Sequence, residues 1–398
     1  MKVLVISHMY PSSFNEISGI FVHEQVKALV AKGAKVQVVS PVPWTPFPIN
    51  YLSSKWKKYS AVPERTVYEG INIWYPRYVT FPRSWFFASS GQRMYLGIKD
   101  VVAKIYKEFQ FDLIHAHVAL PDAYTGMKIA QKYKKLLIVT IHGQDFQQTI
   151  FKNNKCKKNI EKTINFSEKT IVVSKKLKRS SENNLQISSN KIKVVSNGIN
   201  RNDIYAKTNN NFQEYKGKKI ILSVSHLVRT KGIDLNIKVI AKLKQKYPDI
   251  IYLIIGEGKE KKSLEKLVNE LNLQNIVIFI GEVSHHKVMK YMEACDIFSL
   301  PSWNEGFGVV YLEAMAQGKP VIGCKGEGIE DFVEDGKTGL LVKPKDVDSL
   351  VKALDFLLSH PTEAQEMGKR ARDLVLNNYT WEKNAEKMIE IYKGVFRR

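Results

Sequence analysis

Two glutamates bracket a glycine loop in the segment PSWNEGFGVVYLEAMAQGKP, which runs from Pro301 to Pro320. A short apolar run precedes the segment, so the predicted order is buried strand, glycine loop, helix. Loop N–H groups and the positive end of a helix dipole meet at such a point and favour an anion such as a phosphate. Glu305 stands ahead of the predicted helix and Glu313 about two turns into it, so we expect them to contact different parts of a bound molecule. A glycine-rich turn with two solvated acids is the alternative.

Two cations follow another predicted strand. Arg229 and Lys231 come directly after the apolar run IILSVSHL. At the mouth of a parallel sheet they could neutralise a diphosphate, Arg as a planar fork and Lys as a point charge. An ordinary basic loop in a lysine-rich protein would look the same. After a third strand, the glycines at Gly256 and Gly258 would let backbone approach a ligand.

The first half of the chain contributes histidines at strand ends. Gly19 opens a predicted helix whose N-terminus could face the same phosphates. His115 and His117 end one predicted strand, and His142 and Asp145 follow the next. Alternation places the first two histidines on one side of a strand, but a turn after His115 would free His117 to point into a cleft. A structural role is the alternative for each histidine, and no carboxylate or cysteine lies at the spacing of a metal site.

These residues must be positioned by alternating strands and helices. The chain opens with the strand KVLVIS, a helix with Val22, Val26, Leu29 and Val30 on one face, a left-handed end at Gly33, and the strand KVQVVS. Four more strand and helix pairs follow before residue 200. The pattern predicts an α/β fold with a doubly wound parallel sheet.

The second half repeats this pattern after a polar, asparagine-rich stretch. We interpret residues 201–217 as a linker between an N-terminal domain, 1–200, and a C-terminal domain, 218–379. The final amphipathic segment, 380–398, is expected to pack back on the first domain. In such sheets ligands bind beyond the carboxyl ends of the strands, where the charged and glycine-rich loops lie.

Length and composition bound the possible classes. A chain of 398 residues with 44% apolar and 25% charged residues indicates a soluble protein of two domains. No apolar run reaches the roughly 18 residues of a membrane span, and the opening is too short for a signal peptide, so we expect a cytoplasmic protein. Three widely spaced cysteines suggest buried thiols in a reducing compartment.

Positive charge is concentrated in the first half. Residues 1–200 carry 30 Lys and Arg against 12 Asp and Glu, a balance of +18, whereas the remainder carries 31 against 27, a balance of +4. Basic residues there are interleaved with four of the six tryptophans, Trp44, Trp56, Trp74 and Trp85. Aromatic rings and cations suit an anionic membrane surface, so we expect peripheral docking at the inner face of the plasma membrane.

The segment DIFSLPSWNEGFGVVYLEAMAQGKPVIG resembles the E-x7-E signature of the family 4, or group 1, retaining glycosyltransferases, which have the GT-B fold. SHLVRTKGID resembles the diphosphate-binding segment of the family, and HAHVALPDA resembles variants in polysaccharide and teichuronic-acid-type envelope enzymes. The resemblance covers almost the whole chain. It implies two Rossmann-like domains facing a cleft and transfer of a sugar from a nucleotide donor, with UDP the commoner nucleotide, to a glycan or lipid-linked acceptor.

The resemblance also implies roles for individual residues. Glu313 should hold the ribose and Glu305 the donor sugar near its reacting face, while His117 lies beside that sugar. The remaining implied donor-side residues are Arg229 and Lys231 on the diphosphate, and Gly19, Gly256, Gly306, Phe307 and Gly308 in the phosphate loops. His142 and Asp145 are expected on the acceptor side.

No cofactor or metal is expected. The cations make a metal unnecessary, and the Asp-x-Asp at Asp346 and Asp348 lies on a surface-like segment. The chain departs from the family pattern GGIPE at Glu327, Glu330 and Asp331, and it has Ser18-Gly19 where paired glycines are common. These departures bear on donor preference.

Two other functions are compatible with parts of the sequence. A nucleotide-sugar 2-epimerase would share the architecture, and it would convert a donor without any acceptor. A basic, non-catalytic membrane- or nucleic-acid-binding protein would explain the charge of the first half but not the residues at the strand ends. We therefore expect no nucleic-acid partner.

Overall fold

The computed structural model describes residues 1–13, 15, 18–204 and 213–397, and it divides the chain into two compact units. Unit 1 comprises Met1–Asn197 with Trp381–Arg398, and unit 2 comprises Gly198–Thr380. Within the predicted linker, α8 (Arg201–Ile204) is helical and Gln213–Tyr215 forms a 3-10 turn. The central part of that linker, 205–212, lies outside the described residues.

Unit 1 is built on an eight-stranded sheet. The strand order is β10-β9-β8-β7-β1-β2-β5-β4, and all neighbours are parallel except β4 and β5. The order reverses between β1 and β7, where Ile6 lies opposite Ala116. The strands are β1 (Lys2–Ile6), β2 (Lys35–Val39), β4 (Arg65–Tyr68), β5 (Ile71–Trp74), β7 (Leu113–His117), β8 (Leu136–Ile141), β9 (Lys169–Val172) and β10 (Ile192–Val194), and a separate pair joins β3 (Val42–Pro43) to β6 (Arg77–Tyr78).

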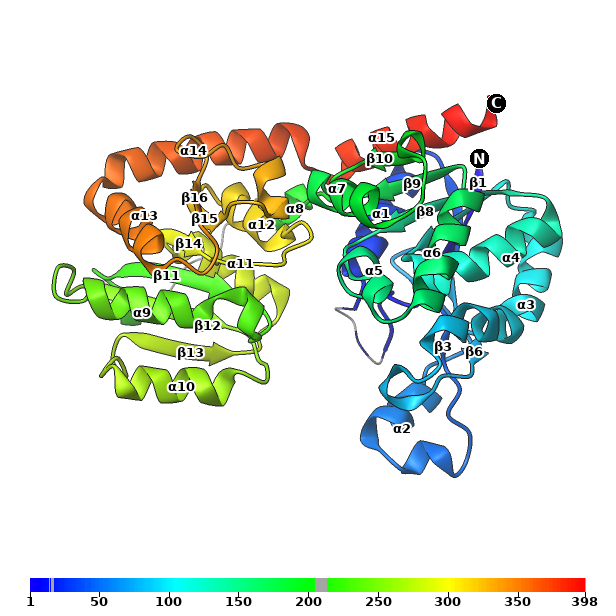
Figure 1. The fold of residues 1–398 in the computed structure, drawn as a ribbon, viewed down its shortest axis with the longest axis horizontal. Helices are drawn as coiled ribbons and strands as arrows, with labels where there is room; N and C mark the ends of the chain where they lie inside the picture. Colours follow the sequence, from blue (N-terminus) through cyan, green and yellow to red (C-terminus); the bar gives the residue numbers. More distant parts are fainter. Residues whose placement is uncertain (14, 16–17, 205–212, 398) are drawn as a thin grey trace. The chain divides into compact units, whose positions relative to one another are not determined.

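Helices cover both faces of this sheet (Figure 1). The first of them buries Val22, Val26 and Leu29 as predicted, but Val30 is 42% exposed and lies at the margin of the buried face. Gly33 has a φ of 88° and ends the helix in the left-handed region as predicted. The helices are α1 (Ile20–Ala31), α2 (Ser54–Ser60), α3 (Ser90–Phe109), α4 (Tyr124–Tyr133), α5 (Gln144–Gln147), α6 (Asn154–Phe166) and α7 (Lys175–Asn184).

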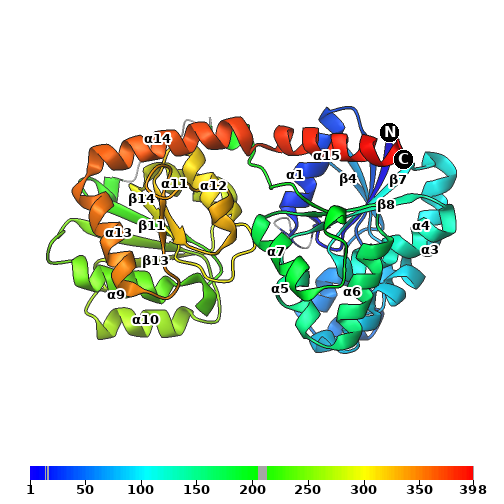
Figure 2. The same cartoon turned by 45° about the horizontal axis from the view of Figure 1, so that its top comes forward.

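The C-terminal helix, α15 (Trp381–Phe396), belongs to unit 1 and runs beside α1 (Figures 1 and 2). Met388 and Tyr392 enter the same hydrophobic core as β1 and α1. The Gln25 side-chain amide donates to Asn384 Oδ1 at 2.7 Å, which fixes the register of the two helices in a buried environment.

Unit 2 has a six-stranded, fully parallel sheet of order β13-β12-β11-β14-β15-β16. Its strand order therefore reverses between β11 and β14. The short strand β16 is an addition to the five strands that the sequence predicts. Its elements are β11 (Lys219–Val224), α9 (Ile233–Leu243), β12 (Ile250–Ile255), α10 (Lys261–Glu270), β13 (Val277–Gly281), α11 (His285–Ala294), β14 (Ile297–Ser299), α12 (Val309–Ala316), β15 (Val321–Cys324), β16 (Leu340–Val342), α13 (Val347–Ser359) and α14 (Pro361–Asn378).

The cysteines and the helices bear on two further predictions. Cys156, Cys295 and Cys324 are free and buried, as expected, and burial raises the pKa of the last two thiols to about 12. Across the described ranges, every helix is too short or too polar to cross a bilayer.

Candidate active site

The point where the strand order of unit 2 reverses brings two predicted loops together. The loop after β11 contains Arg229 and Lys231, and the loop after the neighbouring β14 begins at Pro301. Trp303 N donates to Thr230 O at 2.8 Å and joins the loops directly. The reversal point of a doubly wound sheet is where such folds bind ligands.

Glycine is required for this approach. Gly232 ends the first loop with a φ of 70°, and a Cβ there would lie 2.5 Å from Pro301 O. Any larger residue would therefore push the two loops apart.

An ion pair joins the two loops at their side chains. Lys231 Nζ lies 2.6 Å from Glu305 Oε2, and Ser302 Oγ lies 3.3 Å from the same oxygen. The lysine and glutamate side chains are 25% and 15% exposed, so the pair is accessible but shielded. The Arg229 side chain is exposed and, within the described ranges, forms no ion pair. The structure thus brings three predicted donor-side residues to one edge and leaves a cation there for an anionic ligand.

The glycine loop leads into α12. Gly308 precedes the helix with a φ of 92°, and a Cβ there would clash with the Tyr311 ring at 2.6 Å. Burial raises the pKa of Tyr311 well above its usual value, and its hydroxyl donates to Leu300 O. Phe307 was predicted to line the phosphate loop, but its side chain is buried and packs on Phe332 at 5.1 Å. Only the backbone of Phe307 is therefore available to a ligand.

Glu313 lies on α12 at its fifth residue, about one turn from the start rather than the predicted two. Its side chain is 19% exposed, and His285 Nε2 lies 2.9 Å from Glu313 Oε1. The sequence analysis missed His285 because it opens a different helix, α11, and only the fold places it beside the glutamate. The neighbouring imidazole holds the carboxylate in one orientation.

Glycine is required at position 256 for a different reason from the predicted one. Gly256 has a φ of 129°, and a Cβ there would lie 1.9 Å from Ser225 O. The close approach is thus to backbone of the chain itself, which packs the loop after β12 against the loop after β11.

Glu327, one of the acids that depart from the family pattern, has a local structural role. Glu327 is 8% exposed and accepts a hydrogen bond from the backbone N–H of Glu305. Gly328 N donates to Glu305 O at 3.3 Å, so this segment stabilises the glycine loop.

Asp346 caps α13, and Asp348 pairs with Lys242 at 2.8 Å. The Asp-x-Asp therefore stabilises a helix start.

At the corresponding edge of unit 1, β7 continues through His117. The strand does not turn after His115, so the alternation holds, and the two rings lie on one side of the strand with centroids 4.4 Å apart. Both nitrogens of His115 are bonded, Nε2 to Thr140 Oγ1 and Nδ1 to Tyr392 OH, each at 2.7 Å. Burial lowers the pKa of His115 to about 3. His115 is therefore a neutral structural residue.

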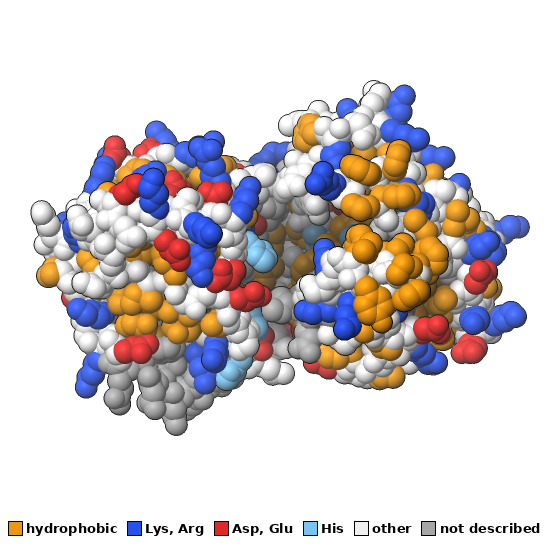
Figure 3. Space-filling view, turned by 90° about the horizontal axis from the view of Figure 1, so that it is seen from below, with side chains coloured by type: hydrophobic (Ala, Val, Ile, Leu, Met, Phe, Trp, Pro, Cys, Tyr) orange, Lys and Arg blue, Asp and Glu red, His pale blue; other side chains and the backbone are white. Residues whose placement is uncertain are grey.

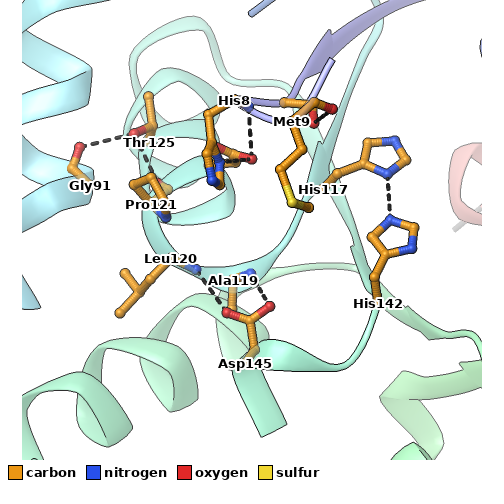
Figure 4. Close-up of polar contacts among 12 residues, drawn as sticks. His8, Met9, Gly91, His117, Ala119, Leu120, Pro121, Thr125, His142 and Asp145 are labelled. Atoms are coloured by element: carbon orange, nitrogen blue, oxygen red, sulfur yellow. Dashed lines mark hydrogen bonds and ion pairs between the residues drawn. The ribbon is translucent and has the colours of Figure 1, made fainter. Parts of the chain in front are cut away.

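His117 and His142 form a stacked pair (Figure 4). His117 Nδ1 lies 3.0 Å from His142 Nε2, and the rings are inclined by 8°. The other ring nitrogens, His117 Nε2 and His142 Nδ1, are buried without a partner among the described residues. Burial lowers the pKa of His142 to about 3 and that of His117 well below its usual value. One unused N–H and one unused lone pair remain, which a sugar hydroxyl could satisfy.

Gly19 and Asp145 shape the loops around this pair. A Cβ on Gly19 would lie 2.1 Å from Met9 O, so glycine lets α1 begin against the loop after β1. Asp145 is 2% exposed and accepts from Ala119 N and Leu120 N at 3.0 and 3.3 Å (Figure 4). Because both oxygens are used by backbone, Asp145 fixes the loop after β7, and we assign it no contact with an acceptor.

A second pair at this edge escaped the sequence analysis. His8 follows β1, and its Nδ1 lies 2.9 Å from both carboxylate oxygens of Asp122. His8 N also donates to Asp122 Oδ2 at 3.1 Å. The signal in the sequence was its position, since His8 follows the first strand of unit 1 as Arg229 follows the first strand of unit 2. Within the described parts of the chain, no three His, Cys, Asp or Glu side chains form a group suited to a metal ion.

Comparison with known proteins finds a matching family model for each of the two units. The model of the group 1 glycosyl transferases matches residues 206–374, and that of Glycosyltransferase Family 4 matches residues 18–203. A glycosyltransferase of Methanocaldococcus jannaschii is 31% identical over 71% of this chain and 75% of its own length. TuaC of Bacillus subtilis, named for teichuronic acid biosynthesis, is 27% identical over 99% of both chains.

Solved structures show the same fold. Sucrose-phosphate synthase from Thermosynechococcus elongatus covers 100% of this chain and 99% of its own with a TM-score of 0.83 at 22% identity. HepE of Anabaena, solved with UDP, covers 99% of this chain and 100% of its own with a TM-score of 0.75 at 18% identity. The two doubly wound units thus form the GT-B fold that the sequence predicts. The chain belongs to the group 1, family 4 glycosyltransferases.

Proposed function

We propose that this protein is a retaining glycosyltransferase that moves a sugar from a UDP-sugar to a glycan or lipid-linked acceptor of an envelope polysaccharide. The observation that carries the proposal is the edge of unit 2 where Arg229, the Lys231–Glu305 pair and the start of α12 meet. That edge offers cations and helix N–H groups to a diphosphate, and carboxylates to sugar hydroxyls. The envelope assignment is supported by the full-length similarity to TuaC.

In this mechanism the nucleoside diphosphate leaves from the face of the sugar that the acceptor attacks. Arg229, Lys231 and the α12 dipole stabilise the charge that develops on the diphosphate. Glu305 accepts hydrogen bonds from the donor sugar, and Glu313 accepts them from the ribose. The unused nitrogens of His117 and His142 bind sugar hydroxyls in unit 1.

The donor and the absence of a metal requirement are tested together. We expect UDP-sugars to raise the melting temperature of the protein more than other nucleotide sugars do, since ligand at 100 times its dissociation constant adds about 2.7 kcal/mol of stability. UDP-glucose is the first candidate, because HepE was solved with it. EDTA should leave transfer intact. Stabilisation by other nucleotides alone would contradict the UDP assignment, and strict metal dependence would contradict the mechanism.

We also propose that unit 1 docks on an anionic membrane through an aromatic face. This face consists of Trp44, Phe47, Leu52, Trp85 and Phe86, whose side chains are 55–81% exposed. Hydrophobic side chains gather on this side of unit 1, with lysines and arginines around them (Figure 3).

Local contacts hold parts of the aromatic face in place. Phe81 and Phe86 lie 5.5 Å apart, and the Arg93 guanidinium lies 4.9 Å from the Phe81 ring. Trp44 N donates to Tyr78 O at 2.8 Å, which joins the β3 side to the β6 side. Lys55, Lys57, Lys58 and Arg83 are exposed nearby in the sequence. Trp74 does not contribute, because it is half-buried, bonds Gln37 and carries Arg65 over its ring.

Sedimentation with liposomes tests this docking. We expect binding to vesicles with anionic lipid, weakened by salt, because each cation near such a surface contributes about 1 kcal/mol. The double variant Trp85→Ala, Phe86→Ala should lose binding, whereas Phe356→Ala, which removes an exposed phenylalanine of unit 2, should not. Binding that ignores lipid charge and salt would exclude the electrostatic contribution, and full binding by the double variant would exclude the aromatic one.

A further inference from the structure

Unit 1 has a pocket of about 510 Å³ between β6 and the first half of α3. The elements β3, β6 and α3 lie side by side in this unit (Figure 1). The apolar wall of the pocket consists of Trp44, Val79 and Leu96, which are 42–55% exposed, and Arg77 and Arg93 line it as well. Its volume lies within the range of small-molecule sites. An apolar wall combined with two cations suits an anion that carries an apolar chain.

The packing of α3 on β6 brings the two arginines to the same pocket. Gly97 lies at this contact, and a Cβ there would lie 2.4 Å from Arg77 O, so glycine lets the helix approach the strand. Arg93 lies one turn before Gly97 and therefore on the same face of α3. Its Nε donates to Val79 O at 3.1 Å, which holds the side chain along the pocket.

The protein leaves both guanidinium charges without a carboxylate. Arg77 Nη2 donates to Val62 O, and Arg77 Nη1 is buried without a partner among the described residues. Arg93 Nη1 donates to Phe86 O at 3.2 Å and to Ser89 Oγ at 2.6 Å. All these acceptors are neutral, and among the residues that the structure describes neither arginine forms an ion pair. The pocket therefore keeps two positive charges that an anionic ligand would neutralise.

Partial burial strengthens the attraction of these charges. Burial lowers the pKa of Arg77, and Glu64, which lies beyond ion-pair distance, offsets only part of that effect. Burial lowers the pKa of Arg93 in the same way, with Tyr78 as the opposing group. Both side chains stay protonated, but they have lost part of their hydration. An anion therefore gains more here than at a fully solvated lysine, and a phosphate matches the planar guanidinium fork.

The position of the pocket indicates where its anion comes from. Trp44 belongs both to the pocket wall and to the aromatic face defined above. The ring of Phe81 lies 4.9 Å from the Arg93 guanidinium and 5.5 Å from the ring of Phe86, another member of that face. The pocket thus borders the surface that we expect to meet the bilayer. Phosphate groups with apolar chains are concentrated at such a surface, whereas free phosphate is not.

We propose that this pocket binds the phosphate group of an anionic lipid, with Arg77 and Arg93 neutralising the phosphate and the adjoining methylene groups lying against Trp44, Val79 and Leu96. The inference rests on the membrane docking proposed above. It adds a site for one lipid molecule to a face that would otherwise recognise only the charge and polarity of the bilayer.

Calorimetric titration with octyl phosphate, below its micelle concentration and without vesicles, tests the pocket directly. We expect one molecule to bind per protein and to shift the indole N–H resonance of Trp44. Inorganic phosphate lacks the chain and octyl β-D-glucoside lacks the charge, so each should bind at least about tenfold more weakly. Equal affinity for inorganic phosphate would overturn the assignment to a lipid, and equal affinity for the glucoside would overturn the role of the arginines.

Two variants place the binding in this pocket. Arg93→Gln removes one cation but also its bonds to backbone, so Leu96→Glu is the second variant, because it adds a negative charge to an exposed wall and removes no hydrogen bond. Each should weaken binding of octyl phosphate at least about tenfold with an unchanged melting temperature for Leu96→Glu. Arg179→Gln, which removes an exposed arginine of α7, should bind as the wild type does. Full affinity in Leu96→Glu would overturn the proposal.

Sedimentation with phosphatidic acid vesicles separates the pocket from the docking face. We expect Leu96→Glu to bind these vesicles more weakly than Arg179→Gln does. Octyl phosphate binding by a protein that does not sediment would contradict the docking and leave the pocket in place. Sedimentation of a wild type that binds no octyl phosphate would overturn the pocket and leave the docking in place.

Discussion

The two sheets have the same strand order around their reversal points, but the side chains at those points differ in charge. In unit 2 the edge carries an accessible ion pair, Lys231 with Glu305, and the exposed cation Arg229. In unit 1 the edge carries buried imidazoles, of which His117 and His142 are held neutral by burial. The charges at the edge of unit 2 suit an anion, and the neutral rings at the edge of unit 1 suit uncharged hydroxyls.

In these two sheets, strand order determines where a ligand can bind, whereas the burial of the side chains determines what kind of ligand can bind there. Partly exposed charged side chains keep enough water to remain ionised. A partly exposed cation can also exchange its carboxylate partner for a diphosphate. Buried histidines give up their charge but keep their hydrogen-bonding capacity, and an unsatisfied buried nitrogen gains from any hydroxyl that reaches it.

The largest expected effect comes from removing the cations. Arg229→Ala or Lys231→Ala should lower turnover of the intact donor by roughly 100-fold or more, because each contact strengthens as the diphosphate charge develops. Binding of bare uridine should change little. Steady-state kinetics check this, with Lys238→Ala, which removes an exposed lysine of α9, as control. Unchanged turnover in both variants would exclude the diphosphate assignment.

The two glutamates should separate turnover from binding. Glu305→Gln should chiefly lower kcat, since it removes the carboxylate beside Lys231. Glu313→Ala should chiefly weaken binding of UDP, by about 10- to 100-fold, the range expected for a charged hydrogen bond. Calorimetric titration with UDP and measurement of kcat distinguish the two. Equal loss of both parameters in both variants would argue against separate roles.

The histidine pair should act without titrating. His142→Phe should reduce transfer by about tenfold, because it removes one hydrogen-bonding partner of His117 and leaves the other group less well oriented. Since burial lowers the pKa of His142 to about 3, the ratio of wild-type to variant rate should stay constant between pH 5 and 8. A ratio that changes across that range would show that the pair becomes charged.

The smallest expected effect concerns stability. Burial raises the pKa of Asp145 to about 6 from its usual value of 3.8, so its stabilising contribution is complete below pH 3.8 and is lost as pH rises through 6. Asp145→Asn lacks this pH-dependent contribution to stability, and it should therefore destabilise unit 1 more at pH 5 than at pH 7.5. We expect the gap in melting temperature to differ by about 4 °C between the two conditions. A larger gap at pH 7.5 would mean that the carboxylate is stabilised in its charged form.

The sequence predicted most of the sheets and the residues at their edges. Apolar runs identified both sets of parallel strands, and the order strand, loop, helix placed Arg229, Lys231 and Glu305 at one edge. The short pairs β3 with β6 and β4 with β5 were missed because they are too brief, or too exposed, to produce a clear alternation of apolar residues.

Contacts between distant segments could not be predicted in the same way. His285 meets Glu313, and His8 meets Asp122, only because the fold makes neighbours of segments that are 28 and 114 residues apart. The bonding of His115 depends on Tyr392, which lies at the other end of the chain. A single sequence shows that a histidine follows a strand, but not whether both of its nitrogens are already used.

The most direct test of the account is calorimetric titration of UDP against the wild type, Glu313→Ala and Asp346→Ala. The account predicts that UDP binds the wild type without added metal, that Glu313→Ala binds at least about tenfold more weakly, and that Asp346→Ala, which removes a helix cap in the same unit, binds as the wild type does. Wild-type affinity in Glu313→Ala, or no binding of UDP to the wild type, would contradict the claim that the edge formed by β11, β14 and α12 holds the nucleotide of the donor.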